Sequence, residues 1–268
     1  MYATKEFPKF RRGRVDVVKE ARQQLVIRNN LERRYFKKLN AMFKKFIKVH
    51  MFLYTRFGIY EPDLASGALN EDLIPETLQH YRRITKLIYE HAERLANRKN
   101  VVVFGRNLEF ERRIEEYFAG RELVLVGITQ SMANKVQAEI VRLRGEGLNA
   151  QQIARGIVAK FTRINLARAK TIARTETHNA ASFANDEYHQ DVRRTLGTKM
   201  KKKWIPTEDE RTRPAHAEMR NKPAIDMDEK FIVGGKKMKY AGDPAGGPEN
   251  VINCRCVIIY VDEEDELQ

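Results

Sequence analysis

The sequence predicts an α+β fold, with a predominantly helical N-terminal two-thirds and a small antiparallel C-terminal sheet packed on an alanine-rich helix. Three observations predict it. Apolar residues recur at three- and four-residue steps as far as about residue 190. Short apolar runs between Gly- and Pro-rich loops follow from about residue 199. Hydrophobic residues make up 42% of the 268 residues, which is enough to build a core.

Residues 1–60 are predicted to form a basic helical arm. Apolar residues from Val18 to Leu53 keep a helical spacing, but the spacing fails at Arg28 and Glu32, so we expect a break or kink there. The arm holds sixteen Lys and Arg against four Asp and Glu, or +12 of the chain's net charge of +14. A segment this basic favours a polyanionic partner.

One face of the predicted arm gathers cations at helical spacing. This pattern is also typical of a solvated helix face, or of a surface that binds an acidic protein. The DNA interpretation assigns phosphate contacts that are independent of base sequence and sensitive to salt. The candidate nucleic-acid-binding residues are Arg33, Arg34, Lys37, Lys38, Lys44, Lys45 and Lys48.

Residues 61–163 are predicted to be a helical region. Gly and Pro residues indicate a loop over 58–76, and an apolar stripe indicates a helix over 78–95. The run 101–104 is a short strand or a buried turn. Further helices are predicted over 108–118, 123–143 and, after Asn149 as N-cap, 149–161.

Residues 164–262 are predicted to form an α+β domain, followed by an acidic tail at 263–268. Asn165 is the expected N-cap of an alanine-rich helix over 166–190, whose small side chains permit close packing. Three β-like pieces follow, at 203–205, 231–233 and 257–261.

Four short motifs stand out in this last part of the chain. Arg174 and Glu176 are two residues apart on a helix, so each must find its partner elsewhere, and Arg211 and Asp209 are the best candidates. A general base at Glu176 or His216 would lack a nucleophile or a phosphate-binding loop, so we predict a structural role and no catalytic residue. The motif residues are Arg174, Thr175, Glu176, Trp204, Asp209, Arg211, Thr212, His216, Asn253, Cys254, Arg255 and Cys256.

The two cysteines, Cys254 and Cys256, are too few for a disulfide framework and indicate a reducing compartment. On a strand they would share one face, with Arg255 opposite. Zinc would require further ligands, with His216 as the third and His178 or Asp209 as the fourth. A lone Cys-x-Cys pair is more often buried packing, so we predict no metal ion and no cofactor.

The order of the motifs is similar to that of the phage Mu F-like head-morphogenesis family, over about residues 166–260. It runs Arg-Thr-Glu, Trp, Asp-Glu-Arg-Thr-x-x-x-His, a Gly- and Pro-rich loop, and Asn-Cys-Arg-Cys. Members commonly carry Pro-x-His-Pro before the last motif. This chain has Pro248–Ile252 instead, and the missing histidine weakens a metal interpretation further.

The resemblance implies a minor head protein of a tailed bacteriophage, located inside the virion head at the portal vertex. Its implied partners are the portal protein, packaged double-stranded DNA and a major capsid or scaffold protein, with assembly in the host cytoplasm. The alternative is a phage-encoded enzyme, either a nuclease or a nucleotide-transferring toxin-like domain. We expect no membrane partner and no export, because the chain has no apolar run of membrane-spanning length and its start has no apolar signal-peptide centre.

Overall fold

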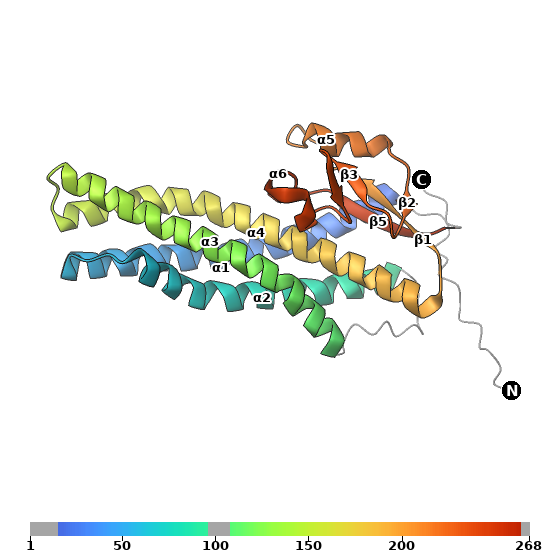
Figure 1. Cartoon of the computed structure of the whole chain (residues 1–268), viewed down its shortest axis with the longest axis horizontal. Helices are drawn as coiled ribbons and strands as arrows, with labels where there is room; N and C mark the ends of the chain where they lie inside the picture. Colours follow the sequence, from blue (N-terminus) through green and yellow to red (C-terminus); the bar gives the residue numbers. More distant parts are fainter. Residues whose placement is uncertain (1–15, 96–107, 264–268) are drawn as a thin grey trace. The chain divides into compact units, whose positions relative to one another are not determined.

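The computed structural model describes residues 16–95 and 108–263. The chain divides into two compact units, and each is built from separated segments. Among the described residues, unit 1 comprises 16–31, 82–95, 108–110 and 174–263, and unit 2 comprises 32–81 and 111–173. Figure 1 traces the helices α1 (Val17–Phe57), α2 (Pro62–Leu95), α3 (Leu108–Gly145), α4 (Ala150–Leu196), α5 (Pro214–Ala217) and α6 (Gly247–Val251), and the strands β1 (Met200–Ile205), β2 (Ile225–Asp226), β3 (Phe231–Val233), β4 (Lys236–Met238) and β5 (Val257–Asp262).

The first two long helices are more continuous than the sequence predicts. α1 runs through Arg28 and Glu32 without the expected break. The predicted loop over 58–76 is wrong, because α2 already begins at Pro62 and contains Pro75. A buried stripe of Ala65, Leu69 and Leu73, spaced four residues apart, explains this helix, since its burial offsets the cost of a proline inside it.

The third and fourth long helices are also single elements. The two predicted helices at 108–118 and 123–143 are one helix, α3. α4 continues through Asn165, which is buried inside the helix and is not an N-cap. Asn149 does cap α4, because its side chain accepts from the Gln152 N–H at 3.0 Å while Gln152 accepts from the Asn149 N–H at 2.9 Å.

Unit 2 is a bundle of four helical segments from α1, α2, α3 and α4 (Figure 1). Buried polar contacts join neighbouring segments: the Tyr35 hydroxyl lies 2.5 Å from that of Thr77, and the Tyr60 hydroxyl donates to the Ala133 carbonyl. The Tyr35 ring also stacks on His80, with 4.0 Å between ring centroids. These contacts join α1 to α2, and the connection between those two helices to α3.

Unit 1 holds the C-terminal sheet, which has the strand order β2-β1-β5 and is antiparallel. β3 and β4 form a separate hairpin. The predicted strands at 203–205, 231–233 and 257–261 are therefore confirmed. In the register of β1 and β5, Trp204 lies opposite Ile258 and Lys202 opposite Tyr260.

β5 is buried along its whole length because helices cover both of its faces. Val257, Ile259 and Val261 pack against Ala21 near the start of α1. On the other face, the Tyr260 ring stacks on His189 of α4 with 4.3 Å between centroids. The predicted packing of the sheet on the alanine-rich helix is thus confirmed.

The predicted four-part division of the chain remains a prediction. Its boundary between residues 163 and 164 falls inside α4, and its first segment, 1–60, contributes to both compact units. The predicted strand or turn at 101–104 lies outside the described residues, as does the acidic tail after Glu263.

Candidate functional site

The candidate site is the set of motif residues that unit 1 brings together around the turn before β5. Thr175 and Glu176 of α4 are buried, and Arg174 is partly buried. The Asn253 N–H donates to the Thr175 hydroxyl at 3.1 Å. Asn253 has a φ of 59°, a left-handed conformation that asparagine tolerates, and this turn directs the following Cys254 inward.

Asp209 ties two loops of the site together. Both of its carboxylate oxygens accept from the Arg255 guanidinium, one of them at 2.7 Å. It also accepts from the Arg211 N–H at 3.0 Å and from the Thr212 hydroxyl at 3.4 Å. The hydrogen bonds from Arg255 hold the pKa of Asp209 well below its usual range. Contact of Asp209 or Arg211 with Arg174 and Glu176 stays a prediction.

Trp204 and His216 pack edge to face at the centre of the site. Their ring centroids are 5.5 Å apart, and the Phe231 ring also packs edge to face on the indole, with 5.4 Å between centroids. Both Trp204 and His216 are buried, which agrees with an anchoring role for the lone tryptophan.

The His216 ring points one nitrogen at the two thiols. Its Nδ1 lies 3.4 Å from Cys256 Sγ and 3.7 Å from Cys254 Sγ, and its Nε2 lies 3.3 Å from Asn250 Oδ1. All four side chains are buried. Both cysteines precede β5 and are not part of it, so the prediction that they share one face of a strand was wrong.

The two thiols differ in acidity. The pKa of Cys256 is lowered, chiefly by hydrogen bonding to Cys254, whereas the same pairing and burial raise the pKa of Cys254. His216, Cys254 and Cys256 are the side chains of this site that could hold a metal ion.

Arg28 of α1 is a site residue that the sequence interpretation missed. Its guanidinium donates to the Cys256 carbonyl and to His178 Nδ1, both at 3.0 Å, and to the Ser182 hydroxyl at 3.4 Å. Burial lowers the pKa of Arg28 to about 10. The failure of the apolar spacing at Arg28 was the available signal, because a cation at a core position requires buried partners.

A second missed group is Asp186, Tyr260 and Lys202. The Tyr260 hydroxyl donates to Asp186 at 2.8 Å, and the Lys202 ammonium donates to the Lys239 carbonyl at 2.9 Å. Burial raises the pKa of Asp186 to about 6. The first hydrogen bond joins β5 to α4, and the second joins β1 to Lys239, the residue after β4.

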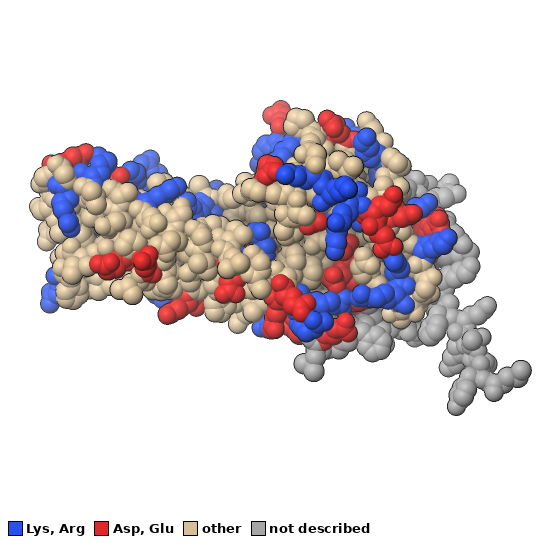
Figure 2. Space-filling view, viewed as in Figure 1, with Lys and Arg blue, Asp and Glu red and all other residues tan. Residues whose placement is uncertain are grey.

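The seven candidate DNA-binding residues lie in unit 2, and all are exposed. At about 100° per residue they fall within an arc of about 140° around α1. Lys38 pairs with Glu76 at 2.6 Å and Lys45 with Asp72 at 3.3 Å. The face drawn in Figure 2 carries both signs of charge, with Lys and Arg lying among Asp and Glu.

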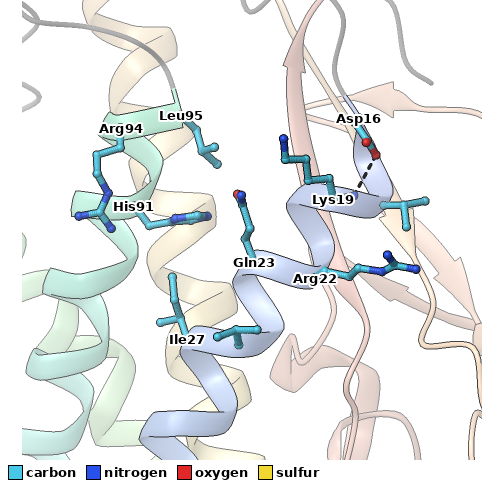
Figure 3. A pocket seen from close by; sticks show the side chains of 10 residues that line it. Asp16, Lys19, Arg22, Gln23, Ile27, His91, Arg94 and Leu95 are labelled. Carbon is cyan, nitrogen blue, oxygen red and sulfur yellow. Dashed lines mark hydrogen bonds between the residues drawn. The ribbon is translucent and has the colours of Figure 1, made fainter.

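Unit 1 also has a groove of about 810 Å³ between the start of α1 and the end of α2. In Figure 3, Gln23 of α1 and His91 of α2 project into it from opposite sides. Its lining has more cations, Lys19, Arg22 and Arg94, than anions, and it contains none of the motif residues.

Comparison with known proteins identifies one family. The family described as "Phage Mu protein F like protein" matches residues 134–259. An NAD(+)–arginine ADP-ribosyltransferase of Enterococcus faecalis (strain ATCC 700802 / V583) is 33% identical over 130 residues, which are 48% of this chain. They are 26% of that protein, so the chain spans about a quarter of the curated relative's length. No solved structure matches the chain significantly. Residues 134–259, which contain every motif residue of the site, are thus similar to the phage Mu protein F like family.

Proposed function

We propose that the chain is a structural, non-enzymatic minor head protein of a tailed bacteriophage, placed inside the head at the portal vertex. In this role it takes part in head morphogenesis and contacts the packaged DNA. The portal protein is its expected partner, with a major capsid or scaffold protein as a further one. No helix within residues 16–95 and 108–263 has the length and apolar character needed to cross a bilayer.

One observation carries the structural role: the motif side chains bond to one another and to the backbone. Asp209 holds Arg255, Thr175 holds the turn at Asn253, and His216 bonds to Asn250. Residues committed to such contacts stabilise loops, whereas a catalytic group must meet a substrate. These contacts therefore support a structural role for the motif residues.

The exposed cations of α1 support contact with DNA. These cations gather on one side of α1, so they suit contact with a row of phosphates, and such contacts would not depend on base sequence. The experiment measures affinity of the full chain for a double-stranded oligonucleotide across a range of salt concentrations. If six phosphates are neutralised, the slope of log affinity against log salt is roughly −5.

A triple variant with Lys37→Gln, Lys44→Gln and Lys48→Gln tests which cations bind. Removing three phosphate contacts reduces the magnitude of the slope by about 2.7. The control variant changes Lys236 and Lys237, which are exposed on β4, to Gln and should keep the slope. Absence of binding at low salt contradicts DNA contact, and an unchanged slope in the triple variant contradicts contact through these cations of α1.

Association with the portal is tested by co-purification. The tagged chain should retain the portal ring after nuclease treatment, and it should be detected among the proteins of purified virions. Its absence from assembled particles would contradict the structural role. Retention of the portal only while DNA is intact would indicate that DNA, and no protein contact, joins the two.

The similarity to the Enterococcus faecalis protein favours a second candidate, an NAD⁺-dependent transferase. The test incubates the chain with labelled NAD⁺ and an arginine-containing acceptor protein. We expect no transfer. Transfer that is lost in Glu176→Gln or His216→Gln, with the fold intact by circular dichroism, would establish the enzyme and overturn the structural proposal.

A further inference from the structure

We propose that His216, Cys254 and Cys256 bind one thiophilic divalent cation, zinc being the expected ion. The ligand atoms of the three side chains all lie within 4.8 Å of one another. Each residue exposes about 2% of its surface. The inference needs neither the DNA contact nor the portal contact of the proposed function.

The spacing of the ligand atoms fits a tetrahedral ion. Zinc lies about 2.3 Å from a thiolate and about 2.0 Å from an imidazole nitrogen, which places tetrahedral S and N ligands roughly 3.5 Å apart. The observed separations between His216 Nδ1 and the two Sγ atoms are 3.4 and 3.7 Å, on either side of that value. An ion can therefore enter with small side-chain shifts.

Asn250 sets the His216 tautomer that metal binding requires. Its amide nitrogen donates to the Gly246 carbonyl at 2.9 Å and to the Val233 carbonyl at 3.4 Å, so its Oδ1 faces His216. Because Oδ1 can only accept, the proton of the neutral imidazole lies on Nε2. The lone pair of Nδ1 is then directed at the thiols. Such an outer hydrogen bond commonly orients a metal-ligating histidine.

The backbone around the two cysteines is built to present both sulfur atoms to one point. The left-handed turn at Asn253 is held by Thr175, and Arg255 is drawn away to Asp209. The buried guanidinium of Arg28 donates to the Cys256 carbonyl. These contacts preorganise the loop, which lowers the entropic cost of binding an ion.

The donor set selects the type of ion. Two thiolates and an imidazole favour zinc over magnesium, calcium or manganese, which prefer oxygen ligands. Within residues 16–95 and 108–263, no fourth His, Cys, Asp or Glu joins the cluster. The two fourth ligands considered from the sequence lie elsewhere, His178 against Arg28 and Asp209 against Arg255.

The full chain, reduced and freed of metal, is titrated with Co²⁺ and then with Zn²⁺. Cobalt should give a thiolate charge-transfer band that saturates at one equivalent, and zinc should remove it. X-ray absorption of the zinc form should show two sulfur ligands at about 2.3 Å and nitrogen or oxygen at about 2.0 Å. This measurement on the unmodified chain decides the inference even if a variant does not fold.

The variants Cys254→Ser, Cys256→Ser and His216→Gln should each weaken zinc binding at least tenfold. Asn250→Ala, which removes the orienting contact, should weaken it by about 10- to 100-fold. His178→Gln is the matched control, because His178 is equally buried but outside the cluster, and it should keep the cobalt band.

Three results would overturn the site. They are a folded, fully reduced chain that binds well under one equivalent of zinc, an absorption spectrum without sulfur ligands, and unchanged affinity in folded His216→Gln. Each would mean that the three side chains are hydrogen-bonded packing groups only.

Discussion

Trp204 is buried at the centre of the site, and only 1% of its surface is exposed. Its ring contacts the rings of both His216 and Phe231. The indole has a large apolar surface and directly contacts the motif histidine His216. The contribution of this side chain to stability can therefore be tested separately from any binding role.

Trp204→Ala should destabilise the chain by about 3 kcal/mol or more, since the truncation leaves a cavity among buried neighbours. The measurement is the free energy of unfolding from chemical denaturation. Ile232→Ala is the control: Ile232 is next to Phe231 in β3 but is 65% exposed, so its loss should cost less than about 0.5 kcal/mol. A similar cost for both variants would contradict the central position of the indole.

Asp186 should make the stability of unit 1 depend on pH. Burial raises its folded pKa to about 6 from the usual 3.8, so the folded state binds the proton more tightly than the unfolded state. Stability is therefore greatest below pH 4 for this group and is lost as the pH rises through about 6, by roughly 3 kcal/mol.

Asp186→Asn checks this dependence because an amide oxygen can still accept from Tyr260 but does not ionise. Denaturation at pH 4.5 and pH 7.5 should show a smaller loss of stability in the variant than in the unmodified chain. An equal loss in both would place the titrating group elsewhere.

Among the elements, the loop that precedes η2 (Pro244–Gly246) approaches α4 closely at Gly242. Its φ is 89°, and a Cβ there would lie 2.8 Å from both Asn179 Oδ1 and His178 Cδ2. No residue but glycine meets both conditions, the left-handed backbone and the close approach.

Gly242→Ala should therefore cost more than backbone strain alone. Gly235→Ala is a matched control, since Gly235 has a φ of 75° but a Cβ there would meet nothing within 4 Å. We expect about 1 kcal/mol for Gly235→Ala and at least about 1 kcal/mol more for Gly242→Ala, from overpacking. Equal unfolding free energies would mean that the loop can move away from α4.

At the scale of the whole molecule, unit 1 is assembled from three separated segments. Its core joins Ala21 of α1 to Val257, Ile259 and Val261 of β5. The buried Arg28 of α1 also donates to the Cys256 carbonyl. A fragment limited to the predicted α+β domain would expose one face of β5 and leave the Arg28 partners unsatisfied.

The fragment 164–262 should consequently lack a cooperative thermal transition, whereas the full chain should have one. Circular dichroism followed through a temperature scan distinguishes the two. A sharp transition in the fragment would support the predicted domain boundary at residue 164 and would show that the α1 contacts are dispensable.

Much of the architecture was predictable from local patterns. The three strand cores at 203–205, 231–233 and 257–261 were found from short apolar runs, and Asn149 from its place before an apolar-periodic segment. Two of the errors share a cause: Pro75 and Asn165 are local helix-breaking or capping signals that lie inside α2 and α4. Burial of the surrounding helix outweighed those local preferences.

The sequence by itself determined the α+β class, the family similarity of residues 134–259 and the identity of the motif residues, because these depend on periodicity and motif order along the chain. Only the tertiary structure decided which motif residues meet. It joined Asp209 to Arg255, directed His216 toward both thiols, and placed Arg28 of α1 against Cys256. Residues 28 and 256 are 228 positions apart, and no local pattern encodes a contact over that separation. The physical reason is that a buried charge is stable only where packing brings its partners to it.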